Sequence, residues 1–330
     1  MAVPGVGRRV LPPDLLPTVG DALFRVARIT AVLSVGVFLA NVAVAFGAVE
    51  RVAALSRFLT GPANLPDEVG TAILTTAAST TAGYGMLAEF RESGMLDDRA
   101  TLVAVTINTF FGFVQHIFTF YVPVLIPILG LEVGLMYVGA RAGISLGITL
   151  AGIAGGALFV SERNVDPTKT VAADARDEDE RTRREAIERA WERTVSKVRR
   201  IVPRLAVVYV LVTLLVRYVD LRSATAAADP LAAVVGLPGA AVPVIAVFAF
   251  DTTAGAATIA PLVGGTFTPR TAVATMLLGG IVSFAVSTFK RSIPFQYGIW
   301  GPSFGSKVVA VNTSLKVVFI AAALAVVLGM

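Results

Sequence analysis

The chain carries the same short motifs twice, in one register. The tetrapeptide Thr-Thr-Ala-Gly stands at residues 80–83 and again at 252–255, an offset of 172. Leu-Pro stands fifteen residues before each copy, at 65–66 and at 237–238. A glycine pair also recurs, at an offset of 171, as Gly130 with Gly134 and as Gly301 with Gly305. Motifs that recur together indicate that the chain contains two copies of one structural unit.

Both copies lie in an apolar setting. Of the 330 residues 55% are hydrophobic, the mean hydropathy is +0.75, and only 15% are charged, against about 25% in a soluble domain. A helix needs about 20 apolar residues to cross a bilayer. Apolar segments that we expect to span occur at 29–49, 99–120, 133–160, 205–219, 270–289 and 307–328. We therefore predict an all-α polytopic membrane protein of the cell membrane, with the lipid bilayer as its surroundings.

Composition also excludes several classes of site. There is no cysteine, so disulfides and thiolate metal sites are excluded. The lone histidine, His116, rules out a metal site with two histidines of one chain, and we predict no metal ligands. The net charge of +5 lies at membrane edges and in one linker, as the positive-inside rule expects, so we predict no nucleic-acid partner. Whether copies of the chain assemble into a homo-oligomer stays open.

Each tetrapeptide joins two apolar segments that are too short to span. They cover 67–79 and 82–90 in the first copy, and 240–250 and 256–263 in the second. Short segments joined in this way indicate a re-entrant hairpin or a broken helix, with Gly83 permitting a tight turn. Each repeat then has three spans plus one re-entrant helical hairpin. Because three is odd, the two repeats must have inverted topology.

The charge distribution divides the chain into four parts. We predict an N-terminal segment over 1–28, a first membrane repeat over 29–160, a charged cytoplasmic linker and helix over 161–203, and a second repeat over 204–330. With the linker inside, the loop 121–132 lies outside, and it contains no Lys or Arg.

The tetrapeptides are candidate binding sites because a helix broken inside a membrane exposes backbone groups at its tip. Side chains, water or a ligand must satisfy these groups. Asp251 is also a carboxylate at membrane depth, which is costly unless paired or hydrated. Two readings stay open: the polar groups cap the half-helices, or they line a substrate site. The candidate residues are Ser79, Thr80, Thr81, Gly83, Asp251, Thr252, Thr253 and Gly255.

Further polar residues stand within the predicted spans. Asn108 and Gln115 are seven apart and share a helix face, with His116 beside them; they either bind a ligand through amide donor–acceptor pairs or hydrogen-bond between helices. Arg141 stands in a span and matches Asn312 at the offset of 171, just as Ser145 matches Lys316. Arg141 is either functional, paired with Asp251, or it snorkels to the membrane edge.

Residues 143–147 fit the pattern Gly-x-Ser-x-Gly of serine hydrolases, but they lack the strand–turn–helix context that the nucleophile needs. Gly139, Gly143 and Gly147 instead predict a ridge for helix packing. No Walker motif is present. We expect no enzyme activity.

These residues, in this order, resemble the nucleoside-recognition, or Gate, domain membrane proteins of archaea and bacteria. The family is related to concentrative nucleoside transporters and to the pore of ferrous-iron transporters. The resemblance covers roughly 29–160 and 204–328, and implies that the hairpin tips bind a nucleoside and a coupling cation, with Asn108 and Gln115 as base or ribose contacts. The GTPase domain and the cysteines of the iron transporters are missing. The matching segments are Leu65-Pro66, Thr80 to Leu87, Asn108, Gln115-His116, Pro123, Pro127 to Gly130, Thr252 to Gly255, Trp300 to Pro302, and Gly305 to Lys307.

The sequence thus predicts a secondary transporter of a small polar solute, such as a nucleoside or nucleobase. Coupling would be to Na⁺ or H⁺, with no other cofactor, and the site would lie between the two hairpins. A non-transporting membrane binding or assembly protein and a divalent-metal pore are the alternatives.

Overall fold

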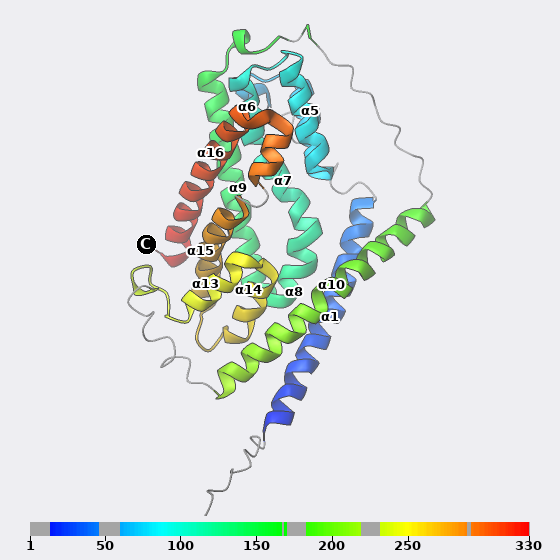
Figure 1. The fold of residues 1–330 in the computed structure, drawn as a ribbon, viewed down its shortest axis with the longest axis vertical. Coiled ribbons are helices and arrows are strands. Elements are labelled where there is room, and N and C mark those ends of the chain that lie inside the picture. Colours follow the sequence, from blue (N-terminus) through cyan, green and yellow to red (C-terminus); the bar gives the residue numbers. More distant parts are fainter. Residues whose placement is uncertain are drawn as a thin grey trace, which may run out of the picture.

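The computed structural model describes residues 14–45, 60–166, 168–169, 183–218, 232–288 and 292–329. The elements of these residues are helices, joined by turns (Figure 1). Three helical stretches among them are long and apolar enough to cross a membrane, and they cover Asp98–Leu129, Leu131–Phe159 and Ile293–Leu328. This confirms the all-helical class and fits an integral membrane protein.

Helices α1 (Leu15–Ala45) and α10 (Arg183–Tyr218) pack against each other and extend to one side of the main body (Figure 1). They are antiparallel, because Asp14 meets Arg217 at one end and Phe38 meets Trp191 nearer the other. Helix α1 begins well before the predicted span at 29. Helix α10 continues through Pro203, so the charged helix and the next apolar segment form one element across the boundary predicted there.

The first half of the body (60–160) is a series of short helices that ends in one long helix. Two short helices lie close to the segments 67–79 and 82–90 that the sequence predicted, and we call this pair the first hairpin. The elements of this half are η1 (Gly61–Ala63), α4 (Asp67–Ala78), α5 (Thr80–Glu92), α6 (Asp98–Ile107), α7 (Thr109–His116), the π-helical η2 (Ile117–Leu125), α8 (Ile126–Leu129) and α9 (Leu131–Phe159). The 3-10 turn η3 (Glu162–Asn164) follows α9.

Helical structure continues through Pro123 and Pro127, between the spans predicted at 99–120 and 133–160. A π-helical segment accommodates Pro123 because its wider turn changes the backbone pairing that proline disrupts. The chain breaks at Gly130, whose φ of 82° favours glycine.

The second half of the body (232–329) also begins with a pair of short helices, which we call the second hairpin, and ends in a long helix. Its elements are α13 (Ala241–Phe250), α14 (Thr252–Ile259), η5 (Ala260–Leu262), α15 (Pro269–Ser287) and α16 (Ile293–Leu328). Helix α16 is kinked at Gly301, where φ is 73° and ψ is 164°, close to the 82° and 167° of Gly130. The glycine correspondence read from the sequence therefore has a backbone counterpart.

Two hydrophobic clusters interlock the halves. One joins the first hairpin to Trp300, Phe304 and Val308 at the kink of α16. The other joins the second hairpin to α8, α9 and the π-helical segment of the first half. Each hairpin therefore packs beside the backbone bend of the opposite half, the first hairpin at Gly301 and the second at Gly130. We call these two bends the glycine corners.

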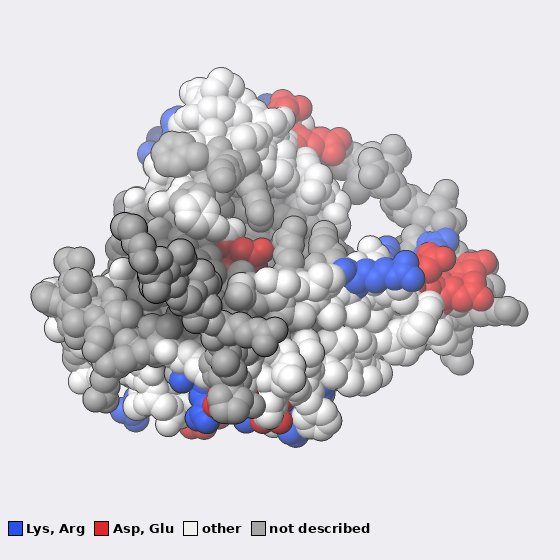
Figure 2. Space-filling view, turned by 60° about the horizontal axis from the view of Figure 1, so that its bottom comes forward, with Lys and Arg blue, Asp and Glu red and all other residues white. Residues whose placement is uncertain are grey.

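Large apolar side chains also cover the outside of the long helices. Leu158 of α9 is 75% exposed and Val326 of α16 is 81% exposed. Figure 2 shows charged residues in a few groups near the margin and one acidic group near the middle of the view, with uncharged surface among the other described residues. Such a surface is suited to lipid rather than to water.

Candidate functional site

The two tetrapeptides begin helices that follow matching breaks. Between α4 and α5 the chain is extended at Ser79, with φ −146° and ψ 107°. Between α13 and α14 it is extended at Asp251, with φ −148° and ψ 114°. Ser79 Oγ accepts a hydrogen bond from the Ala82 N–H at 3.4 Å, and Asp251 Oδ1 accepts one from the Ala254 N–H at 2.8 Å. Both residues are therefore N-caps of the following helix.

The glycines of the tetrapeptides do not form the turns, which corrects the prediction for Gly83. Gly83 lies inside α5 against α4, where an added Cβ would stand 2.6 Å from the Ala72 carbonyl oxygen. Gly255 lies inside α14, where an added Cβ would stand 2.6 Å from Cα of Phe248. The extended cap residue supplies each turn, and glycine lets the two short helices approach closely.

Asn108, which precedes α7, and Gln115 near its end both hydrogen-bond to the first helix pair, and we call this side the amide face of α7. Thr80 Oγ1 donates to Gln115 Oε1 at 2.7 Å, and Gln115 Nε2 donates to the Ala78 carbonyl at 3.4 Å. Asn108 Nδ2 donates to Thr76 Oγ1 at 2.9 Å in the buried interior. Among the described residues, Asn108 Oδ1 is buried and has no hydrogen-bond partner. The amides therefore bond between helices and leave one buried acceptor at the first break.

The remaining candidates around the breaks are more open to the surroundings. His116 is exposed, and its Nδ1 lies 2.8 Å from the Gly112 carbonyl oxygen of its own helix. Thr81 is exposed, while Thr252 and Thr253 are half-buried beside Asp251. Of the predicted threonines, Thr80 is thus the one that meets the amide face of α7.

Arg141 points into the helical body. Its Nε donates to the Tyr121 hydroxyl at 3.3 Å. Lys316 lies on α16 one helical turn after Asn312. Its Nζ is 4.3 Å from the centre of the Phe284 ring. The sequence analysis did not select Lys316, although a lysine inside an apolar span was a sufficient signal.

The Gly-x-Ser-x-Gly pattern lies in the middle of α9. Ser145 Oγ donates to the Ala142 carbonyl at 3.0 Å, so Ser145 is held by its own helix. Of the three glycines of the predicted packing ridge, Gly139 and Gly143 have open space beside them, where an added Cβ would meet no described atom within 4 Å. Only Gly147 is in close contact, with the Phe319 ring.

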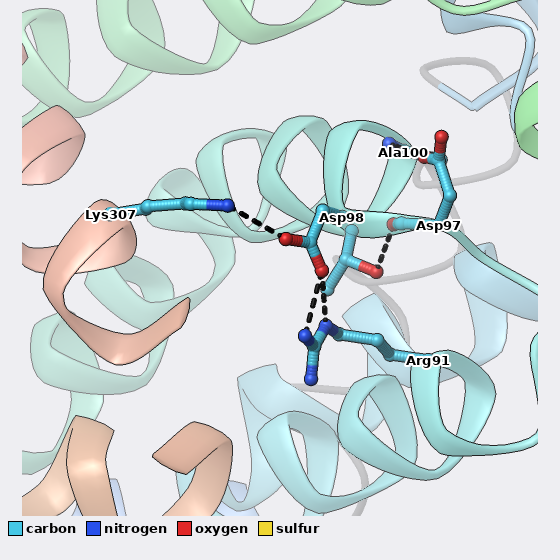
Figure 3. Close-up of polar contacts among 6 residues, drawn as sticks. Arg91, Asp97, Asp98, Ala100 and Lys307 are labelled. Atoms are coloured by element: carbon cyan, nitrogen blue, oxygen red, sulfur yellow. Dashed lines mark hydrogen bonds and ion pairs between the residues drawn. The ribbon is translucent and has the colours of Figure 1, made fainter. Parts of the chain in front are cut away.

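An ion network joins three elements at one end of the body (Figure 3). Asp98 at the start of α6 accepts from Arg91 Nη2 of α5 at 2.7 Å and from Lys307 Nζ of α16 at 2.9 Å. The Arg91 guanidinium also lies 4.3 Å from the centre of the Phe304 ring. Asp97 caps α6 by accepting from the Ala100 N–H. The network connects the first hairpin to the second half.

A cavity of about 620 Å³ lies between α1, α10 and the end of the second hairpin, away from the predicted residues. Tyr218 donates to Asp14 Oδ1 at 3.0 Å, and Arg217 pairs with Oδ2 at 3.1 Å. The Tyr218 hydrogen bond and the Arg217 charge lower the pKa of Asp14. Sequence reasoning missed this cavity because its walls come from helices far apart in the chain. It is lined by Asp14, Pro17, Thr18, Asp21, Ala22, Arg25, Tyr209, Thr213, Arg217 and Pro261.

Comparison with known proteins gives relatives rather than a family. The chain is 22% identical over 301 residues to the uncharacterized protein MJ0880 of Methanocaldococcus jannaschii, covering 90% of this chain and 95% of that protein. It is 23% identical over 311 residues to the uncharacterized protein MJ0871 of the same organism, covering 91% and 92%. No family model and no solved structure matches the chain. The likeness extends over most of each chain.

Proposed function

We propose that the chain is a secondary transporter of a small polar solute, coupled to Na⁺ or H⁺, in the cell membrane. The observation that carries this proposal is the pair of helix breaks at Ser79 and Asp251, which have nearly the same backbone conformation 172 residues apart. Helix N-termini at such breaks attract electronegative groups, and transporters built from inverted repeats bind solutes at discontinuous helices.

The arrangement of the halves supports an inverted repeat with re-entrant hairpins. In Figure 1 the turn between α5 and α6 lies at one end of the body, and the turn between α14 and α15 lies at the other. Each hairpin packs against the glycine corner of the opposite half. In our proposal the chain is multi-pass, the linker 161–203 is cytoplasmic, and the solute binds where the halves meet.

The polar groups at the breaks fit a solute that donates hydrogen bonds. The buried Asn108 Oδ1 accepts no bond from the described residues, and leaving such an acceptor unpaired costs about 1–3 kcal/mol. An N–H or O–H group of a nucleoside or nucleobase would offset this cost. The carboxylate of Asp251 at the second break is our candidate for the coupling cation or proton.

Uptake into proteoliposomes tests the proposal. Labelled nucleosides and nucleobases are offered with and without a Na⁺ or proton gradient, and Asp251→Asn and Asn108→Leu are compared with Thr81→Val. We expect gradient-driven uptake that is lost in the first two variants and kept in Thr81→Val, whose side chain is exposed. Folded wild-type protein that moves none of these solutes in either gradient contradicts the proposal.

A non-transporting binding or assembly protein is the second candidate. The mutual hydrogen bonding of Thr80, Gln115 and the Ala78 carbonyl favours it, because these groups stabilise the helix pair without a ligand. A Gln115→Ala variant that loses thermal stability while solute binding is unchanged would favour this role. A divalent-metal pore stays a third hypothesis, tested by adding divalent metals to the same binding series.

A further inference from the structure

Two cationic side chains, one from each half of the chain, approach neighbouring turns of α15. Helices α9, α15 and α16 pack against one another. An added Cβ at Gly280 of α15 would stand 3.9 Å from Arg141 Nη1, and the Phe284 ring, one turn further along α15, has its centre 4.3 Å from Lys316 Nζ. At about 1.5 Å per residue, Arg141 lies about 15 Å along α9 from Leu131, and Lys316 lies about 21 Å along α16 from Pro302. Both cations are therefore deep within helices that are apolar enough to span a membrane.

Neither cation is neutralised by the part of the chain that the structure describes. The ion pairs among those residues involve other side chains, so Arg141 and Lys316 have no carboxylate within salt-bridge distance there. Arg141 has a hydrogen bond to the Tyr121 hydroxyl, and Lys316 has the Phe284 ring. Two like charges in apolar surroundings repel each other and lose their hydration, so the arrangement favours an anion that pairs with both.

The neighbouring groups add hydrogen-bond donors. The Tyr121 hydroxyl accepts from Arg141, which leaves its own proton free to donate to a ligand. Thr313, one turn before Lys316, has a buried Oγ1 without a hydrogen-bond partner in the described residues. On α15, Gly280 faces the guanidinium, and an added Cβ would stand 3.9 Å from Arg141 Nη1. Glycine therefore leaves the space beside the guanidinium open.

We propose that Arg141 and Lys316 form a binding site for a small water-soluble oxyanion, a carboxylate or a phosphate. The guanidinium supplies a planar fork for two oxygens, and the ammonium supplies a compact charge. Tyr121 and Thr313 supply hydroxyls. Binding at this site does not depend on transport by the chain.

The site adjoins the second helix break. Tyr137 lies one helical turn before Arg141 on α9. Its ring packs against the ring of Phe248, with 6.4 Å between the centroids, and Phe248 lies three residues before Asp251. A solute that reached from the cations to the break would be an anionic substrate. This extension rests on the proposed transport function, whereas the oxyanion site does not.

Thermal unfolding of the full-length protein in an uncharged detergent tests the site. The probes are sodium phosphate and sodium succinate, each titrated at constant ionic strength. We expect both to raise the unfolding midpoint, and we expect Arg141→Gln and Lys316→Met to weaken the apparent affinity at least about ten-fold. Without added oxyanion, the two variants should unfold at or above the wild-type midpoint, because each removes an uncompensated charge.

The matched control is Lys169→Met. Lys169 is exposed and pairs with Asp166 at 3.5 Å outside the helical body, so its loss should leave the response to both probes unchanged. If Arg141→Gln fails to fold, Lys316→Met and Tyr121→Phe still test the site, and both should weaken binding. A midpoint that neither probe shifts, or an equal shift in wild type and Lys316→Met, overturns the proposal. Stabilisation by phosphatidylglycerol but by neither probe would assign the cations to a lipid headgroup and also overturn it.

Discussion

Gly83 and Gly255 occupy the closest contact within each helix pair, so a methyl group there has little room. We expect Gly83→Ala and Gly255→Ala each to lower the free energy of unfolding by about 1–3 kcal/mol, the usual cost of overpacking. Thermal or denaturant unfolding in detergent measures the change. The matched control is Gly85→Ala in the same helix α5, where an added Cβ meets no described atom within 4 Å.

The control should behave in the opposite way. Alanine is a better helix former than glycine by about 0.5–1 kcal/mol, so Gly85→Ala should leave the unfolding midpoint unchanged or raise it. Equal losses of stability in Gly83→Ala and Gly85→Ala would show that close approach to α4 is not the reason for glycine at residue 83.

Asp14 makes the contact between α1 and α10 dependent on pH. Its pKa is lowered, first by the hydrogen bond from Tyr218 and further by Arg217. The carboxyl group of Asp in an unfolded chain has a pKa of about 3.9. The contact is therefore fully stabilised above that pH, and it weakens as the pH falls through the lower pKa of the folded state. We expect the distribution of distances between spin labels at Leu16 and Leu211 to broaden only below about pH 4.

Two carboxylate variants separate this contact from a general acid effect. Asp14→Asn should remove the pH dependence of the label distance, because the titrating group is gone. Asp21→Asn removes another carboxylate of α1 and leaves the bond to Tyr218 in place, so its transition should match that of the parent. A transition of unchanged size in Asp14→Asn would assign the pH dependence to another group.

At the scale of elements, the first helix pair is held to α7 by the bond between Thr80 and Gln115. We expect a double-mutant cycle with Thr80→Val and Gln115→Leu to give a coupling free energy of about 0.5–1.5 kcal/mol. Unfolding of the four proteins in detergent measures it. Thr81→Val, at the exposed neighbour, should be additive with Gln115→Leu, and additivity at both threonines would contradict the bond.

Local chemistry explains which elements the sequence predicted well. The helix breaks and the matching glycines Gly130 and Gly301 each depend on a few neighbouring residues, so short motifs identify them. The sequence misplaced the turn at Gly83, because a glycine that allows close packing and a glycine that allows a turn look alike in one sequence. The π-helical passage through Pro123 was missed because proline usually ends a helix.

Contacts between distant segments were beyond the sequence. Arg141 and Lys316 come from different halves, and only the packing of α9 and α16 against α15 brings them to neighbouring turns of that helix. The same holds for the cavity between α1 and α10. Spacing predicted the amide face of α7, since Asn108 and Gln115 belong to one helical stretch, but it did not predict that Thr76 and Thr80 would be their partners.

At the scale of the whole molecule, the ion network shows how the halves are tied together. Asp98 is shared by Arg91 of the first hairpin and Lys307 of the second half (Figure 3). Exposed ion pairs contribute about 0–1 kcal/mol each. The hydrophobic clusters at the glycine corners therefore contribute most of the free energy that holds the halves together. Halves joined mainly by apolar packing can slide or rock without breaking a strong polar bond, which fits the proposed transport.

The proposed inverted repeat predicts that matching turns of the two halves face opposite sides of the membrane. Glu92 and Thr266 are exposed at equivalent turns, which lie at opposite ends of the body in Figure 1. The chain has no cysteine, so Glu92→Cys and Thr266→Cys each carry a single thiol. We expect a membrane-impermeant maleimide to label one variant in intact cells and the other in inverted vesicles. Thr168→Cys should label with Glu92→Cys, because Asp166 N–H bonds to the Met95 carbonyl at 2.9 Å. Labelling of Glu92→Cys and Thr266→Cys from the same side would show that the two halves are not inverted.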